Sequence, residues 1–334
     1  MLTVYEGLPP GLLASEARDL HRVLPGPSLI FLPGRREPAL FVSVLLHGNE
    51  DVGLKALQAV LRRHAATGLP RMLAVFVGNV HAARENRRRL DGQPDYNRIW
   101  PGTEQAPSPE TAMAAEVVER VARGGVFASI DLHNNTGLNP PYACVNHLEA
   151  PFLQLATQFS RTVVYFRRPR GLQAMAMAAH CPAVTLECGQ VGNVRGLSMA
   201  TEYLDACLHM VRVASHPVAD HDIDLFQVVA QVHVAPGVSF GFNGAEADLI
   251  FRSELDRMNF QELPRGTCLG ELRRDVAQAL LAWDGIGADV NARYFEARDG
   301  HICLKRTVMP SMLTLDERII RQDCLCYLME RVAL

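Results

Sequence analysis

The chain has 334 residues, 48% hydrophobic and 21% charged, which is typical of a globular protein with one large and one smaller domain. Its 33 basic and 36 acidic residues give a formal charge of −3, which excludes a strong net attraction to nucleic acid or to an anionic membrane. No apolar stretch approaches the roughly 18 residues of a membrane span, and the N-terminal segment lacks the pattern of a signal peptide, so we expect a cytoplasmic protein.

Up to residue 214, apolar runs that predict strands alternate with amphipathic runs that predict helices. A short helix is expected first, around residues 16–24. The predicted strands are 29–32, 39–46, 72–77, 127–131, 142–145, 162–165 and 183–187. The predicted helices are 52–64, 109–122, 151–160 and 196–214. This alternation predicts an α/β fold, with a largely parallel or mixed sheet flanked by helices.

The strand predicted over residues 39–46 leads directly into His47-Gly-Asn-Glu50. The C-terminal edge of an open α/β sheet is where such folds place their ligands. A His-x-x-Glu pair can chelate Zn²⁺, which accepts imidazole nitrogen and carboxylate oxygen. With 12 histidines in the chain, this pair alone is weak evidence for a metal site.

Residues 79–98, which follow the strand predicted over 72–77, carry five arginines. Guanidinium groups suit a carboxylate or an oxyanion because they donate paired hydrogen bonds. A solvated basic loop is the ordinary interpretation of such a run. Because this loop leaves the same sheet that carries the proposed metal ligands, we favour binding of a small anionic molecule.

Two later strands also end in groups that suit a metal site. Asp131-Leu-His133 closes one of them and Glu187 closes the other. Together with His47 and Glu50, these strand ends carry the inventory of a mononuclear zinc hydrolase. We expect one Zn²⁺ per chain, bound by His47, Glu50 and His133, with a fourth position left open.

Three residues beside these ligands have a functional and a structural interpretation. Asp131 lies on the same side of an extended strand as His133, and either holds the far nitrogen of a ligand imidazole or only caps a turn. Glu187 is predicted to be the general base of the hydrolase, with an ordinary surface carboxylate as the alternative. Cys188 could be a nucleophile, but a small residue packed behind the strand end is favoured.

The character of the sequence changes near residue 216. Residues 226–234 alternate in the manner of a strand, and short segments separated by glycine and proline follow. One helix is expected near residues 275–283. We therefore predict a first domain over residues 1–215 and a smaller β-rich domain over residues 216–334.

The eight cysteines are scattered and include no Cys-x-x-Cys pair. This pattern favours reduced thiols in a cytosolic protein over a disulfide framework or a cysteine zinc site.

Taken together, the motifs resemble the succinylglutamate desuccinylase/aspartoacylase family, a branch of the zinc carboxypeptidase superfamily. The resemblance rests on His47-x-x-Glu50, on the arginine-rich loop, on Asp-Leu-His-Asn-Asn-Thr-Gly at 131–137 and on Glu187, all in family order. It covers roughly residues 39–195. It implies a carboxypeptidase-like mixed sheet flanked by helices, with an appended β-rich domain.

The resemblance also implies roles within the arginine-rich loop. Arg88 would polarise the amide carbonyl, with Arg89 as the alternative, because this chain has extra residues between that arginine and Asp95. Asn97 and Arg98 match the pair that grips the substrate carboxylate. The resemblance also assigns metal binding to the three ligands predicted above and activation of water to Glu187.

One feature of aspartoacylases is missing from this chain. They have a further substrate-binding arginine shortly before the catalytic glutamate, whereas residues 173–180 contain no arginine. N-acetylaspartate, with its two carboxylates, is therefore not favoured as the substrate. Arg167, Arg168, Arg170 and Arg195 are candidates to replace the missing side chain, and the sequence does not choose among them.

The expected function is zinc-dependent hydrolysis of the amide bond of an N-acyl amino acid or a similar small carboxylate. The alternatives are a metallocarboxypeptidase acting on peptide C-termini and a non-catalytic small-molecule binding protein, for which a base at Glu187 would be unnecessary. His81, His147 and His180 are not expected to bind the metal. The acyl group, the amino acid and the formation of a homo-oligomer stay open.

Overall fold

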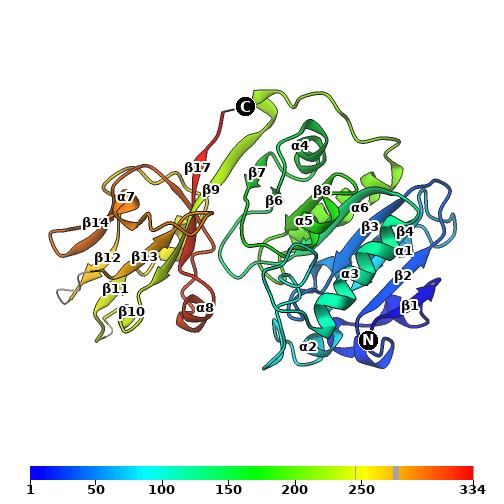
Figure 1. Ribbon diagram of the computed structural model, residues 1–334, viewed down its shortest axis with the longest axis horizontal. Helices are drawn as coiled ribbons and strands as arrows, with labels where there is room; N and C mark the ends of the chain where they lie inside the picture. Colours follow the sequence, from blue (N-terminus) through cyan, green and yellow to red (C-terminus); the bar gives the residue numbers. More distant parts are fainter. Residues whose placement is uncertain (245, 274–277, 334) are drawn as a thin grey trace. The chain divides into compact units, whose positions relative to one another are not determined.

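A computed structural model describes residues 1–244, 246–273 and 278–333. It divides into two compact units, Met1–Asn134 with Pro141–Asp224, and Asn135–Pro140 with Leu225–Leu334 (Figure 1). The division into functional domains over 1–215 and 216–334 stays a prediction, because compact packing alone does not delimit a function.

The first unit contains a mixed sheet with the strand order β1-β2-β4-β3-β5-β8-β6-β7. Its strands are β1 (Thr3–Glu6), β2 (Ser28–Leu32), β3 (Ala39–Val44), β4 (Leu73–Val77), β5 (Val126–His133), β6 (Tyr142–Val145), β7 (Thr162–Tyr165) and β8 (Ala183–Glu187). The neighbours β4, β3, β5 and β8 are parallel, whereas β2 pairs antiparallel with β4, and β6 pairs antiparallel with β8. The α/β class and the mixed sheet are confirmed.

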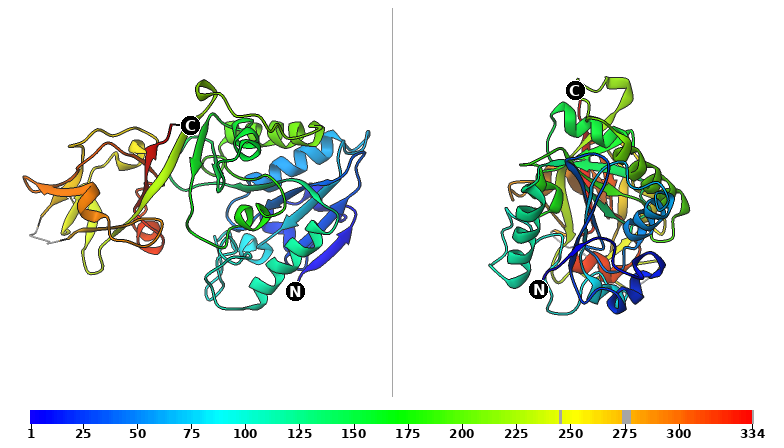
Figure 2. Two further views of the ribbon diagram at one scale, coloured as in Figure 1. Left: turned by 45° about the horizontal axis from the view of Figure 1, so that its top comes forward. Right: turned by 90° about the vertical axis from the view of Figure 1, so that its right-hand side faces the viewer.

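Helices cover both faces of this sheet. They are α1 (Val52–Arg63), α2 (Val80–Arg84), α3 (Pro109–Ala122), α4 (Ala150–Thr157), α5 (Gln173–Met177) and α6 (Val194–His209), with short 3-10 turns at Leu12–Ala14, Ala17–Arg22 and Asp220–Asp222. Gly53 of α1 lies against Leu132, whereas Gln173 of α5 donates to Ser129 Oγ at 2.7 Å. Positions 129 and 132 of β5 face opposite ways, so α1 and α5 lie on opposite faces. Figure 2 shows α3 on one side of the sheet, with α1 and α6 on the other.

The predicted elements of this unit agree with the observed ones to within a few residues. The helix expected over 16–24 is the 3-10 helix Ala17–Arg22, and the helix expected over 196–214 ends at His209. Strand β1 and the five-residue helices α2 and α5 were not predicted. Segments this short carry too little periodicity to be recognised.

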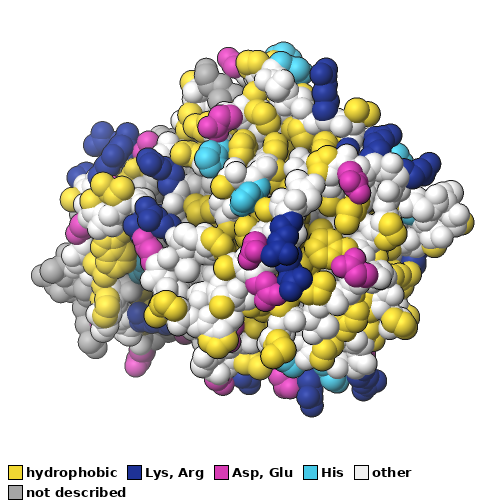
Figure 3. Space-filling view, turned by 45° about the vertical axis from the view of Figure 1, so that its right-hand side comes forward, with side chains coloured by type: hydrophobic (Ala, Val, Ile, Leu, Met, Phe, Trp, Pro, Cys, Tyr) yellow, Lys and Arg dark blue, Asp and Glu magenta, His cyan; other side chains and the backbone are white. Residues whose placement is uncertain are grey.

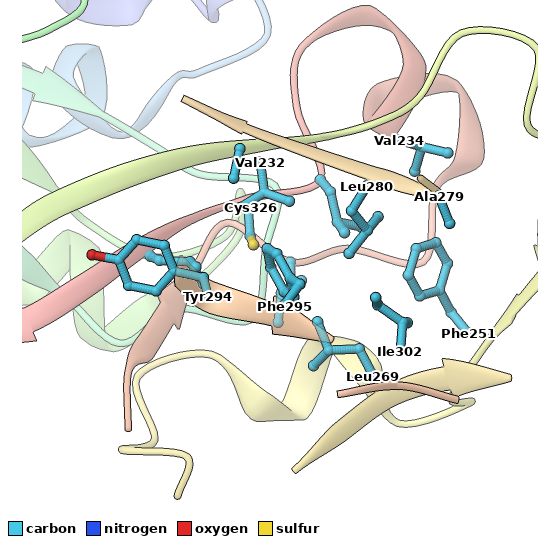
Figure 4. Close-up of a cluster of buried hydrophobic side chains, with 14 of the residues drawn as sticks. Val232, Val234, Phe251, Leu269, Ala279, Leu280, Tyr294, Phe295, Ile302 and Cys326 are labelled. Atoms are coloured by element: carbon cyan, nitrogen blue, oxygen red, sulfur yellow. The ribbon is translucent and has the colours of Figure 1, made fainter. Parts of the chain in front are cut away.

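The second unit is rich in β-structure. Strand β9 (Asp224–Val234) pairs with β17 (Cys326–Arg331) and β13 (Leu280–Trp283), and β17 pairs with β16 (Met309–Ser311). A further sheet has the order β10-β11-β12-β15-β14. Its strands are β10 (Phe240–Phe242), β11 (Leu249–Phe251), β12 (Cys268–Leu272), β14 (Phe295–Arg298) and β15 (His301–Leu304); the helical segments are Leu255–Met258, α7 (Asn291–Tyr294) and α8 (Glu317–Gln322). Side chains from both sheets, including Val232, Phe251 and Ile302, form one core (Figure 4).

The helix predicted near residues 275–283 is wrong over its second half. Leu280–Trp283 is strand β13, paired antiparallel with β9. Leu280 and Ala282 are buried whereas Trp283 is 36% exposed, which is the alternation of a strand with one covered face. Residues 274–277 lie outside the described residues.

The expectation that all cysteines are reduced is wrong for one pair. Cys268 on β12 faces Cys303 on β15, and the two form a disulfide. A separation of 35 residues along the chain gives no sign of this pairing, because only the antiparallel register brings the two together. The other six cysteines are buried thiols that are not part of a disulfide.

Among the described residues, no helix is long and apolar enough to cross a lipid bilayer. On the face drawn in Figure 3, basic side chains lie interspersed with acidic ones, as the small net charge suggests.

The disulfide predicts the outcome of a thiol titration. The protein unfolded without reductant should expose six reactive thiols, because Cys268 and Cys303 are joined, and it should expose eight after reduction. The double variant Cys268→Ser/Cys303→Ser should give six in both conditions. Eight thiols in the unreduced parent would contradict the pairing.

Candidate active site

The predicted site residues lie at the C-terminal ends of three neighbouring parallel strands. Strand β3 leads into His47, β5 ends at His133 and β8 ends at Glu187. In the register of the sheet, His133 is the direct neighbour of Glu187. Neighbouring residues of parallel strands point to the same face and lie about 4.8 Å apart. The strand order therefore places these groups at one edge of the sheet.

A tight turn carries His47 and Glu50 away from β3. Leu45 adopts a left-handed φ of 54°, which is rare for a residue with a side chain and redirects the backbone at the strand end. Gly48 lies against α2, where a Cβ would come within 2.2 Å of Ala83 N. The Glu50 N–H donates to His47 O at 3.2 Å, so both side chains leave one turn.

The three predicted metal ligands lie together and are buried. Glu50 Oε1 lies 2.8 Å from His47 Nδ1, and Glu50 Oε2 lies 2.8 Å from His133 Nδ1. The two imidazole centroids are 5.0 Å apart. Two imidazole nitrogens and a carboxylate are a donor set of catalytic zinc sites, in which Zn²⁺ bonds each donor at about 2.0–2.2 Å. These residues therefore fit a zinc ion.

Two further carboxylates, one for each imidazole, contact the ring nitrogens that face away from Glu50. Asp95 Oδ1 lies 3.0 Å from His47 Nε2, and Asp131 Oδ2 lies 2.8 Å from His133 Nε2. Ser43 Oγ in turn donates to Asp131 Oδ1 at 2.6 Å. Carboxylates in this position fix the ring orientation and the tautomer of metal-binding histidines. Both rings thus keep Nδ1 turned toward Glu50.

Sequence reasoning foresaw one of these two carboxylates. Asp131 contacts His133, which is the first of the two interpretations left open for it. Asp95 was named only as part of the family motif, and its contact with His47 was missed. The position of Asp95 two residues before Asn97 was the available signal for a residue of the site. Its contact with His47 could not be predicted, because 48 residues separate the two and no sequence pattern links them.

The cluster favours ionised carboxylates around a positive charge. Burial opposes ionisation of Glu50, but His47 and His133 outweigh it and hold the pKa of this carboxyl well below its usual range. Burial acts in the same way on Asp95, and His47, together with Arg88 and Arg98, outweighs it and lowers the pKa. Burial also disfavours a charged His133, yet Asp131 and Glu50 raise its pKa well above the ordinary value. A divalent cation satisfies the same preference.

Glu187 and Cys188 occupy different environments at the end of β8. Glu187 is partly exposed at the strand end. Cys188 is fully buried, and its N–H donates to His133 O at 2.9 Å. Burial, together with the negative charges of Glu187 and Glu50, raises the pKa of the Cys188 thiol. A thiol of this kind does not form the nucleophilic thiolate readily, which supports the packing interpretation of Cys188.

Of the two arginines proposed to polarise a carbonyl, only Arg88 contacts the cluster. Arg88 Nη1 lies 3.6 Å from Glu50 Oε1, and Nη2 donates to Asp95 Oδ2 at 3.0 Å. Arg89 is exposed, and its guanidinium donates to Gln93 O at 2.9 Å. The geometry therefore favours Arg88 over Arg89 for a role beside the three predicted ligands.

Asn97 and Arg98 lie beside the same cluster. The Asn97 N–H donates to Asp95 Oδ1 at 2.8 Å, and its side-chain nitrogen lies 3.3 Å from His133 Nε2. Within the described residues, the buried Asn97 Oδ1 has no hydrogen-bond partner. Arg98 Nη1 donates to Asn97 O at 2.7 Å. The loop thus carries both side chains to the edge of the donor set.

Other histidines lie apart from this donor set. His147 pairs with Glu149 at 3.3 Å and stacks on Phe152. Within the residues that the structure describes, the groups able to hold a metal are His47, Glu50 and His133, and separately His64, Asp205 and His209. Neither group includes His81, His147 or His180.

Comparison with known proteins identifies relatives of this chain. Residues 36–212 match the family described as the succinylglutamate desuccinylase/aspartoacylase catalytic domain. A succinylglutamate desuccinylase of Burkholderia orbicola is 30% identical over 197 residues, which are 49% of this chain and 54% of that protein. A second, from Burkholderia cenocepacia, is 29% identical over 197 residues, 49% of this chain and 53% of that protein. The chain thus spans about half the length of these relatives.

Solved structures share the fold. The succinylglutamate desuccinylase of Chromobacterium violaceum superposes with a TM-score of 0.58 at 18% identity, covering 90% of this chain and 86% of that one. Murine aminoacylase 3 superposes with a TM-score of 0.53 at 15% identity, covering 89% of this chain and 97% of that one.

The site predicts how metal affinity responds to the outer carboxylates. We expect one zinc per chain in the parent, and none at this site in His133→Ala. Asp131→Asn and Asp95→Asn should weaken zinc binding about 10- to 100-fold, the usual cost of losing the partner of a metal-binding histidine. Competition with a chromogenic chelator measures the affinity.

Asp205→Asn is the matched control, because Asp205 also accepts from a histidine, His64, at 2.6 Å. Zinc affinity should not change in this variant. Equal losses of zinc affinity in Asp205→Asn and Asp131→Asn would mean that the zinc has been assigned to the wrong group of residues.

Proposed function

The chain belongs to the succinylglutamate desuccinylase/aspartoacylase family, and on this basis we propose that it is a zinc-dependent amidohydrolase. Its substrate would be an N-acyl amino acid or a similar small carboxylate, which it would cleave to an amine and a carboxylic acid. The observation that carries the proposal is the buried donor set beside Glu187. A buried cluster with both metal ligands and a neighbouring carboxylate base suits hydrolysis better than binding alone, which needs no base.

His47 Nδ1, the Glu50 carboxylate and His133 Nδ1 would hold the zinc. Bound there, Zn²⁺ would supply a Lewis acid for the carbonyl and lower the pKa of water. Asp95 and Asp131 would keep the two imidazoles in the orientation that the contacts already have.

Glu187 would move the proton during hydrolysis. Its carboxylate would take a proton from the attacking water as the water oxygen bonds to the amide carbon. The same proton would pass to the nitrogen of the leaving amine as the carbon–nitrogen bond breaks. The register beside His133 supports this role, because it brings Glu187 to the edge of the sheet where the metal ligands lie.

Arg88 would stabilise the negative charge that develops on the carbonyl oxygen. Its approach to Glu50 supports this, and one well-placed donor of this kind contributes a few kcal/mol, roughly 3. Its pairing with Asp95 would fix the guanidinium in position.

Arg98 and Asn97 would bind the substrate carboxylate. The His133 Nε2–H is already directed to Asp131, so the Asn97 side-chain nitrogen faces a second donor. Half a turn of the Asn97 amide would place Oδ1 beside the His133 Nε2–H, which it would share with Asp131, and would free the side-chain NH₂ for the substrate. Because residues 173–180 lack an arginine, N-acetylaspartate is not favoured as the substrate.

The proposal includes several expectations about the whole protein. The parallel central strands support a carboxypeptidase-like arrangement of the sheet. Cleavage of peptide C-termini is less favoured, because the catalytic-domain family to which the chain belongs is named for enzymes of small N-acyl substrates. A cytoplasmic location and formation of a homo-oligomer stay predictions.

The role of Glu187 can be tested in zinc-loaded protein with a panel of N-acetyl and N-succinyl amino acids. Glu187→Gln keeps the shape of the side chain but removes its basicity. Turnover, measured as released amine, should fall about 10²- to 10⁴-fold, while zinc content stays equal to that of the parent. Full activity with zinc bound would remove Glu187 from the mechanism.

The two arginine roles predict different kinetic changes. Arg98→Lys should mainly raise KM, because an ammonium cannot reproduce a paired guanidinium contact. Arg88→Lys should mainly lower kcat, because its contact would matter most in the transition state. Arg89→Lys is the matched control and should leave both constants unchanged. If Arg98→Lys lowered kcat alone, as Arg88→Lys should, the assignment of roles would be wrong.

A further inference from the structure

We propose that Asn134 is a positioning residue that holds Glu187 at a fixed place relative to the metal-binding turn. The proposal rests on the function proposed above. Asn134 directly follows His133 and is buried, with 4% of its surface exposed. Its side chain does not point to solvent or to its own strand, but links two other segments of the site.

The acceptor side of the Asn134 amide holds the start of α1. The Val52 N–H donates to Asn134 Oδ1 at 3.1 Å. Asp51, at the N-cap of α1, makes no side-chain capping bond to the helix. The first N–H groups of a helix need acceptors from outside it, and here Asn134 supplies one from the neighbouring strand. Val52 lies two residues beyond Glu50, so this bond ties the metal-binding turn to β5.

The donor side of the same amide holds the loop after β8. Asn134 Nδ2 donates to Gly189 O at 2.9 Å, and Gly189 lies two residues beyond Glu187. Gly189 has a φ of 80°, and a Cβ there would lie 2.7 Å from Asn193 Nδ2, so this turn suits glycine alone. One amide group thus joins the segment after Glu50 to the segment after Glu187.

Asparagine is the side chain that this position requires. It must accept from Val52 and donate to Gly189, and an amide does both within one short side chain. Aspartate could accept from Val52 but would face Gly189 O with no donor. Leucine has a similar size and offers neither bond. Misplacement of a catalytic group by about 1 Å costs up to about 10²-fold in rate, so the loss of this link should be measurable as turnover.

The test combines hydrogen exchange with a double-mutant cycle in the zinc-loaded full chain. In Asn134→Leu, backbone amides at Val52 and at residues 188–193 should exchange faster than in the parent. In Asn134→Asp, Val52 should stay protected while residues 188–193 exchange faster, which keeps the test valid if the leucine variant folds poorly. Asn146→Leu is the control, because Asn146 also donates from a partly buried amide to a backbone carbonyl, Phe166 O at 2.9 Å.

Turnover then separates positioning from a general structural effect. Asn134→Leu should lower kcat about 10- to 100-fold with KM and zinc content close to those of the parent. Added to Glu187→Gln, it should lower kcat by less than about 3-fold more, because the residue it positions has lost its function. Asn146→Leu should leave kcat unchanged.

Four results would overturn the proposal. Unchanged exchange in both Asn134 variants would mean that the link does not hold the loop. An equal loss of kcat with and without Glu187→Gln would mean that Asn134 acts on something other than Glu187. Full activity of Glu187→Gln alone would overturn the proposed function, and the role of Asn134 with it. A normal kcat in Asn134→Leu, together with an inactive Glu187→Gln, would overturn only the role of Asn134.

Discussion

One buried carboxylate, that of Glu50, joins the two imidazoles on which the candidate active site depends. Its oxygens lie 2.8 Å from His47 Nδ1 and 2.8 Å from His133 Nδ1, although these histidines come from different strands. The contact exists because β3 and β5 are parallel neighbours whose C-terminal ends meet. Burial of three ionisable groups at one point is unfavourable unless their charges are matched. The proposed divalent cation would match these charges in a cluster that the packing of the sheet does not itself require.

The groups around this cluster divide into those that contact its imidazoles and those that we propose to face a substrate. Asp95 and Asp131 hold the far nitrogens of the two rings, one from a loop and one from a strand. Arg88 also contacts Asp95, so the loop that orients His47 also holds the Arg88 guanidinium beside Glu50. A change in this loop would therefore act on the proposed metal ligands and on the proposed anion-binding groups at once, which is why its variants need zinc content and kinetics measured together.

Much of the first unit could be predicted from the sequence, because its strands are buried on both faces and appear as continuous apolar runs. The proximity of His47, Glu50 and His133 could also be predicted, since they lie where such runs end; their role as metal ligands stays a prediction. Contacts between distant segments could not be predicted in this way. The bond from His47 to Asp95, the links made by Asn134 and the disulfide between β12 and β15 depend on register and loop path. Strand β13 was taken for a helix because its alternating burial appears only once β9 pairs with it.

The location of a bound zinc ion is the most direct test of the proposed metal site. Anomalous diffraction at the zinc absorption edge, from crystals of the zinc-loaded full chain, should give one peak per chain. This peak should lie about 2.0–2.2 Å from His47 Nδ1, a Glu50 oxygen and His133 Nδ1. A peak bound instead by His64, Asp205 and His209, or coordination of His47 and His133 through Nε2, would contradict it.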